Sequence, residues 1–149
     1  MRHTSFSAYI YVPKEIVWKL MVDKIENPGY YLPGVLDVRI MERHGHTLMR
    51  EVKAQGMFMK EIVTIDEPHG EIQYALLEHP LISGRVVNRL VSSSIQNPVA
   101  PHRFTIEVEW TPKDDDAEKI VQTDMPAQIQ MEVLSLKKRA EELERGRKV

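Results

Sequence analysis

Residues 47–65, TLMREVKAQGMFMKEIVTI, predict a β-hairpin whose two-residue loop is Gln55-Gly56. Counting outward from that loop gives two sets of cross-strand pairs, one on each face of the hairpin. The first set is Ala54/Met57, Val52/Met59, Arg50/Glu61 and Leu48/Val63, and the second is Lys53/Phe58, Glu51/Lys60, Met49/Ile62 and Thr47/Thr64. The second face holds an opposite-charge pair and a Thr–Thr pair, which are favourable cross-strand neighbours. The first face is mostly apolar, and a one-residue slip would mix the two faces, so this register is favoured.

Arg50 and Glu61 are therefore predicted to lie opposite each other on the interior face. An unpaired charge in an apolar interior is costly, so we expect the two side chains to bond each other, a ligand or water. The functional interpretation is a polar anchor that orients a carboxylate, phenol or carbonyl of an apolar ligand. The alternatives are a structural ion pair at the rim of the cavity, or a different register that places both side chains outside.

Composition limits the class of protein. A chain of 149 residues is long enough to bury about 70% of its unfolded surface, and we expect a single domain over residues 1–149. The net charge of −2 and the pI near 6.3 give no support for nucleic-acid binding. The absence of cysteine excludes disulfides, thiolate catalysis and Cys-ligated metals. Neither a signal peptide nor a membrane span is indicated, so a cytoplasmic protein is expected.

Upstream of the hairpin, the pattern predicts a strand, a helix and a second strand. The first strand is expected over residues 5–12, and apolar residues at helical spacing predict a helix from Pro13 to Asn27. The next segment, NPGYYLPGV, is too apolar for a solvent loop, so it is expected to cover part of the core through Tyr30, Tyr31 and Leu32. The second strand begins near Val35 and is expected to face inward through Leu36, Val38 and Ile40.

Three more strands are expected downstream. They cover residues 71–78 with Ile72, Tyr74 and Leu76 inward, residues 85–94 with Val86, Asn88 and Leu90 inward, and a third strand with Phe104, Ile106, Val108 and Trp110 inward. Arg85 and Arg89 should then face outward, and residues 96–102, which include two prolines, should form a loop.

A long terminal helix is expected to begin at Thr123 or Asp124, both good N-caps, with Pro126 in its first turn. Its apolar stripe is Ile129, Val133, Leu136, Ala140 and Leu143. We expect this stripe to pack on the chain's own sheet, and a homodimer formed through it is the alternative.

Three stretches, in this order and spacing, resemble the START-like superfamily (SRPBCC, helix-grip fold), and within it the AtaL-like branch. They are VPKEIVWKLMVDKIENPGYYLPGV at 12–35, LMREVKAQGMFMKEIVTIDEP at 48–68, and VVNRLVSS at 86–93 followed by FTIEVEW at 104–110. The resemblance implies an α+β fold, in which a curved antiparallel sheet of about seven strands wraps around a long C-terminal helix and two short helices follow the first strand. It also implies a hollow for hydrophobic molecules, but no catalytic residues, because the superfamily includes transporters, cyclases and chaperone activators.

The sequence thus favours binding of a small hydrophobic ligand of lipid, polyketide or aromatic type. The candidate ligand-binding residues are Leu48, Arg50, Val52, Met57, Met59, Glu61, Tyr74 and Asn88. As ordinary core residues, Asn88 would instead bond the backbone, Tyr74 would pair its hydroxyl, and the methionines would fill space. Two other classes remain open: an aromatase, cyclase or dehydratase-type enzyme centred on Glu61, and a protein-interaction or chaperone-activator module.

Other chemistries find no support in the sequence. The six histidines lie near turns, prolines or the N-terminus without metal-ligand spacing, so we expect them to be solvated and expect no metal site. The serine run 92–94 has no nucleophile-elbow glycines. Glycine-rich nucleotide motifs do not occur in the chain, and no cofactor is expected.

Overall fold

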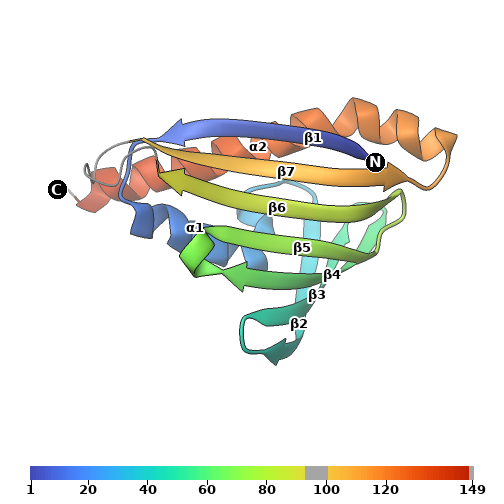
Figure 1. The fold of residues 1–149 in the computed structure, drawn as a ribbon, viewed down its shortest axis with the longest axis horizontal. Coiled ribbons are helices and arrows are strands. Elements are labelled where there is room, and N and C mark those ends of the chain that lie inside the picture. Colours follow the sequence, from blue (N-terminus) through green and yellow to red (C-terminus); the bar gives the residue numbers. More distant parts are fainter. Residues whose placement is uncertain (93–100, 148–149) are drawn as a thin grey trace.

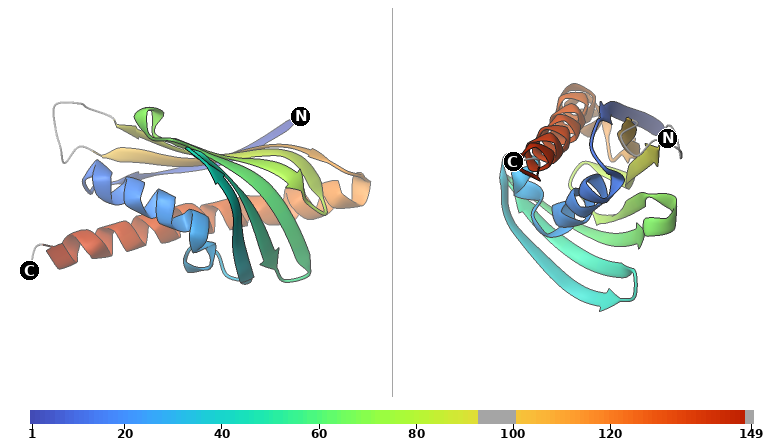
Figure 2. Two further views of the ribbon diagram at one scale, coloured as in Figure 1. Left: turned by 90° about the horizontal axis from the view of Figure 1, so that it is seen from below. Right: turned by 90° about the vertical axis from the view of Figure 1, so that its left-hand side faces the viewer.

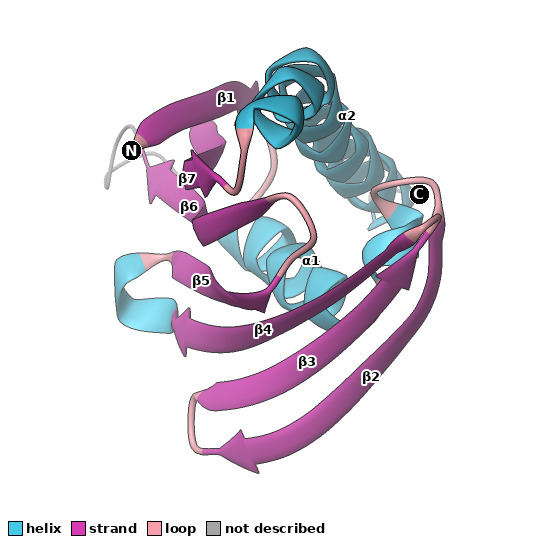
Figure 3. Cartoon of the chain, turned by 90° about the vertical axis from the view of Figure 1, so that its right-hand side faces the viewer, coloured by secondary structure: helices cyan, strands magenta, loops and turns pink. Residues whose placement is uncertain are grey.

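The computed structural model describes residues 1–92 and 101–147. Its elements are β1 (Arg2–Ile10), α1 (Lys14–Glu26), the 3-10 helix η1 (Pro28–Tyr30), β2 (Val35–His44), β3 (Thr47–Ala54), β4 (Met57–Asp66), the 3-10 helix η2 (Glu67–His69), β5 (Glu71–Glu78), β6 (Ile82–Ser92), β7 (His102–Pro112) and α2 (Asp115–Arg147). The strands form one antiparallel sheet in the order β1-β7-β6-β5-β4-β3-β2 (Figure 1). The sheet curves, and both α-helices lie on its concave side (Figures 2 and 3). The predicted helix-grip architecture is confirmed. Among the described helices, none is both long and apolar enough to cross a membrane.

The β3–β4 hairpin has the predicted register. Arg50 pairs with Glu61 and Ala54 with Met57, and the other six pairs also match. Gly56 has a φ of +67° in the loop, a conformation that glycine adopts without steric cost. The hairpin face predicted to be interior is therefore the concave one.

Three strand boundaries and one side-chain orientation differ from the prediction. Leu36 is 70% exposed rather than interior, because the β2–β3 ladder shifts between Val35 and Asp37 and leaves Leu36 at the irregularity. The first strand runs from Arg2 to Ile10 rather than over 5–12, because β7 begins at His102, the partner of Ile10. The strand expected to begin at Arg85 already begins at Ile82. The last two residues of the expected strand 85–94, and residues 96–100 of the expected loop 96–102, lie outside the described residues. Of the rest of that loop, Pro101 is described, and His102 is the first residue of β7.

The terminal helix begins at Asp115, not at Thr123 or Asp124. Asp114 Oδ1 accepts a hydrogen bond from the Ala117 N–H at 2.8 Å, and the acidic first turn suits the positive end of the helix dipole. Thr123 bonds back to the Lys119 carbonyl at 2.9 Å instead of capping, and Pro126 lies inside the helix. The extra turns contribute buried side chains, Ala117 and Val121.

The core lies between the concave face, α1 and α2. Its α2 stripe is buried at Ile129, Val133, Leu136 and Ala140, as predicted, but Leu143 is 46% exposed because the C-terminal end of α2 projects beyond the sheet (Figure 2). Of the aromatic pair after α1, Tyr31 is buried and donates to Asp23 at 2.9 Å. Tyr30, expected to cover the core, is instead 63% exposed, with the Arg139 guanidinium 4.9 Å from its ring centre.

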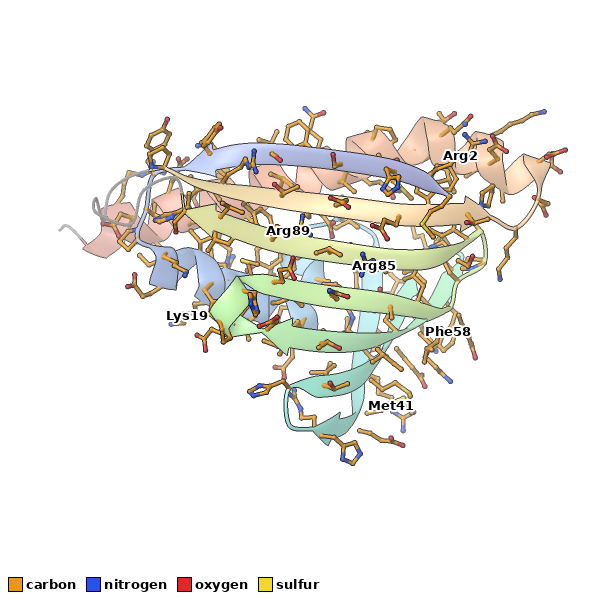
Figure 4. The ribbon with its side chains drawn as sticks, in the orientation of Figure 1. Arg2, Lys19, Met41, Phe58, Arg85 and Arg89 are labelled. Atoms are coloured by element: carbon orange, nitrogen blue, oxygen red, sulfur yellow. The ribbon has the colours of Figure 1, made fainter. Side chains whose placement is uncertain are left out.

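The convex face carries ion pairs. Arg85 and Arg89 project from it (Figure 4), as predicted, and bond Glu109 at 2.8 Å and Glu71 at 2.7 Å. His3 brings a ring nitrogen within 4.8 Å of carboxylate oxygens of Glu107 and Glu109, but these carboxylates already pair with the two arginines.

Two histidines are not solvated as expected. His102 is 4% exposed, and its Nδ1 lies 3.0 Å from the Ser92 hydroxyl. His79 is half-buried, and its Nδ1 accepts hydrogen bonds from the backbone N–H groups of Leu81 and Ile82 at 3.0 and 3.2 Å. Burial, aided by Lys113, lowers the pKa of His79 from 6.5 to about 4.

This pKa predicts an acid-sensitive turn. Between pH 6.5 and 4 the unfolded chain protonates at His79 while the folded chain does not, so the free energy of unfolding should fall as the pH is lowered through this window. We expect a loss of about 1–3 kcal/mol from this residue. His79→Asn keeps an acceptor but cannot titrate, so urea unfolding of both proteins at pH 7 and pH 4.5 isolates the contribution. Equal pH dependence in the two proteins would contradict the prediction.

Candidate ligand-binding site

Four charged side chains meet where α1, the concave face and α2 converge: Lys24, Arg50, Glu61 and Glu132. The residues Lys24, Arg50 and Glu61 are 5%, 8% and 6% exposed, and the Glu132 side chain is 17% exposed. Two cations and two anions leave the cluster without net charge, which is the condition under which buried charges are tolerated.

Arg50 joins the hairpin to the end of α1. Its Nε and Nη2 donate to Glu61 Oε1 at 2.9 and 2.7 Å. Its Nη1 donates to the carbonyls of Ile25 at 2.8 Å and Lys24 at 3.4 Å, in the last turn of α1. A cation there satisfies orphan carbonyls and complements the negative end of the helix dipole. Burial acts to lower the pKa of Arg50, but Glu61 and Tyr74 raise it above its ordinary value, so the guanidinium is charged.

Lys24 and Glu132 were not predicted. Lys24 Nζ lies 3.6 Å from Glu132 Oε1 and 5.5 Å from the ring centre of Tyr74. Burial lowers the pKa of Lys24, and Glu132 opposes that shift. The sequence did contain a signal: Lys24 continues the apolar stripe of α1 at i+7 from Val17, and Glu132 lies at i+3 from Ile129 on α2.

Tyr74 and Asn88 are buried, at 3% and 0% exposure, on the concave face. The Tyr74 hydroxyl and both amide atoms of Asn88 have no hydrogen-bond partner among the described residues. Tyr74 pairs with Val86 on β6, so Asn88 is its diagonal neighbour on the same face. Burial raises the pKa of Tyr74 beyond the range of ordinary tyrosines, so its hydroxyl keeps its proton and can donate. Neither residue therefore makes the hydrogen bonds that were expected of it as an ordinary core residue.

The remaining candidates form an apolar wall along the hairpin. Leu48 belongs to the buried core, whereas Val52 is buried nearer the hairpin loop, and Met57 and Met59 are half-buried beside it. Of the eight candidates, Arg50 lies in contact with both Glu61 and Tyr74. It bonds Glu61, and its guanidinium carbon lies 4.8 Å from the centre of the Tyr74 ring.

A separate pocket of about 440 Å³ opens on another side of α1. It is lined by Lys14, Glu15, Trp18, Lys19, Val22 and Glu67. Figure 4 shows Lys19 at this position, close to η2. None of the eight candidate residues lines it.

A curved seven-stranded antiparallel sheet that holds a long C-terminal helix defines the class: this is a START-like, helix-grip protein. The chain belongs to the family described as acetylaranotin biosynthesis cluster protein L (AtaL), whose sequence profile matches residues 11–142. No curated protein matches the sequence.

Solved structures share the fold at low identity. The Zhui aromatase/cyclase from Streptomyces sp. R1128 is 14% identical, with 94% of this chain and 93% of that chain covered and a TM-score of 0.82. A START superfamily protein from Mycobacterium smegmatis is 16% identical, with 95% and 98% covered and a TM-score of 0.70. The di-domain ARO/CYC BexL from the BE-7585A biosynthetic pathway is 14% identical, with 91% and 46% covered and a TM-score of 0.68.

Proposed function

We propose that the protein binds a small hydrophobic ligand against the concave face of the sheet, and that Tyr74 and Asn88 bond an oxygen atom of it. The observation that supports this is that the Tyr74 hydroxyl and both amide atoms of Asn88 are buried on one face of the sheet without a hydrogen-bond partner among the described residues. Each buried unpaired group costs about 1–3 kcal/mol, and a ligand oxygen that pairs with them would recover that cost. Leu48, Val52, Met57 and Met59 would supply the apolar wall, and methionine adapts to variable shapes.

The ligand oxygen is proposed to be neutral, a hydroxyl or carbonyl of a polyketide or aromatic compound. Arg50 is already matched by Glu61 and by helix carbonyls, and Lys24 by Glu132. A carboxylate would therefore enter an interior without a spare cation, which is unfavourable. In this proposal Arg50 and Glu61 position the ring of Tyr74 and act on the ligand only through it. We propose no metal or organic cofactor.

The proposal predicts a selective loss of binding. Wild-type protein should bind 2-naphthol more tightly than 2-naphthoate, and Tyr74→Phe should weaken 2-naphthol binding about tenfold, the value of one hydrogen bond near 1.4 kcal/mol. The ligand-free variant should be as stable as wild type or more so, because an unpaired buried hydroxyl is removed. Calorimetric titration and urea unfolding measure both quantities. Tyr9→Phe, at a 51% exposed site, is the control. Unchanged affinity in Tyr74→Phe would refute the assignment.

A second candidate is an aromatase or cyclase-type enzyme that uses the same site, favoured by the fold shared with Zhui. Both hydrogen bonds that Arg50 donates to Glu61 reach Oε1, which leaves Oε2 as the oxygen able to take a proton from a ligand. Glu61→Gln separates the two functions: lost turnover with retained binding supports an enzyme, and weakened binding alone supports a carrier.

A further inference from the structure

The outer face of α2 carries a second apolar stripe, which packs on nothing in the described part of the chain. We call the exposed residues Asp116, Ile120, Ala127, Met131, Leu134 and Lys138 the outer stripe. Ile120, Met131 and Leu134 are 46%, 45% and 41% exposed. At roughly 100° per residue, the six positions fall within about 60° of one another, opposite the buried stripe of the same helix. In Figure 3, α2 lies along one edge of the molecule, so the side of this helix opposite the sheet faces outward.

Apart from Met131, the residues of the outer stripe are placed symmetrically about Ala127. Ile120 and Leu134 lie seven residues before and after it, and Asp116 and Lys138 lie eleven residues before and after it. Two antiparallel helices that cross at Ala127 would place Ile120 of each copy opposite Leu134 of the other, and Asp116 opposite Lys138. A parallel pair would instead place like charges opposite each other.

We propose that the outer stripe is the interface of a homodimer, in which two α2 helices pack antiparallel about a twofold axis near Ala127. Alanine at the axis allows the two backbones to approach closely, and the helices, each about 50 Å long, bury the flanking apolar side chains. The interface is isologous, so each contact occurs twice. It differs from the dimer considered from sequence, which would use the stripe that α2 buries on its own sheet.

Charge complementarity is the argument for a second copy over another partner. The first turn of α2 carries Asp115, Asp116 and Glu118, whereas its second half carries both signs and includes the basic run at 137–139, which contains Lys138. Within the described residues, Lys137 bonds Glu141 and Arg139 lies over Tyr30, but no ion pair engages Asp116 or Lys138. These two charges are therefore available to a partner, and the same helix in reverse supplies both complements.

Sedimentation velocity over a wide concentration range tests the proposal. Wild-type protein should dimerise. Asp116→Lys and Lys138→Asp should each weaken dimerisation about tenfold or more, since the twofold axis repeats every like-charge contact. The double variant, which exchanges the two charges, should restore wild-type association. Asp115→Lys is the matched control, because it makes the same charge change one residue away and off the outer stripe.

A monomer at every concentration would overturn the proposal, and would leave the outer stripe to a different partner. A dimer that responds equally to Asp116→Lys and Asp115→Lys would also overturn it, because the contact would then lie elsewhere. Ala127→Arg should abolish the dimer while circular dichroism still reports the folded chain. Binding of 2-naphthol by the monomeric variants keeps this test separate from the ligand proposal.

Discussion

Gly84→Ala should lower the free energy of unfolding by about 3–5 kcal/mol, the sum of backbone strain and steric overlap. Gly84 lies in β6 opposite Trp110 of β7, with a φ of +135° that L-residues rarely adopt. A Cβ atom built there would lie 1.9 Å from the carbonyl oxygen of Glu109 and 3.0 Å from the Trp110 Cα. Both obstacles are backbone atoms of the central β6–β7 ladder, so neither can move without breaking the pairing. Urea unfolding measures the loss.

Gly56→Ala is the matched control for this prediction. Gly56 also has a positive φ, +67°, but nothing lies within 4 Å of a Cβ at that position. Its replacement should cost about 1–2 kcal/mol, the ordinary penalty of a left-handed residue. Similar losses in the two variants would mean that β6 and β7 separate easily at Gly84, contrary to the close approach in the structure.

Local patterns in the sequence predicted most of the fold. The hairpin register followed from one mostly apolar face, from favourable charge and Thr–Thr pairs on the other face, and from a Gly loop. The β7 strand followed from strict alternation, because a strand face is set by parity alone. Leu36 was placed on the wrong face because a ladder irregularity reverses parity without leaving a mark in the sequence. The start of α2 was placed eight or nine residues too late because Pro126 resembles a first-turn proline, whereas the helix continues through it.

The candidate site was predictable in part. The contact between Arg50 and Glu61 follows from hairpin geometry, because both residues belong to one hairpin whose register is set by a short stretch of sequence. The bonds from Arg50 to the end of α1, and the Lys24–Glu132 pair, depend on how two helices dock on the sheet. Arg50, Lys24 and Glu132 each interrupt an apolar stripe. The sequence therefore indicates that each of these charged side chains needs a partner, but it does not indicate which residue that partner is. The unpaired state of Tyr74 and Asn88 depends on tertiary packing as well.

Arg50→Met should lower the free energy of unfolding by about 3–5 kcal/mol, as expected when one member of a buried ion pair is removed. Methionine matches the stem of arginine, so the loss should come from the groups left behind. Glu61 loses the donor of both its bonds from Arg50, and the carbonyls of Lys24 and Ile25 lose theirs at the end of α1. Urea unfolding of the variant measures the total.

Adding Glu61→Leu to Arg50→Met separates the two contributions. The double variant removes the stranded carboxylate, so it should recover the part of the loss that belongs to Glu61. It should remain about 1–3 kcal/mol less stable than wild type, because the α1 carbonyls still have no donor. The coupling energy from the four proteins should exceed that of the partly exposed pair Lys60–Glu78, whose charged atoms lie 3.8 Å apart. The cycle for that pair should give less than about 1 kcal/mol. Additive effects at Arg50 and Glu61 would show that the pair does not hold the hairpin, and full recovery in the double variant would show that the cap on α1 contributes nothing.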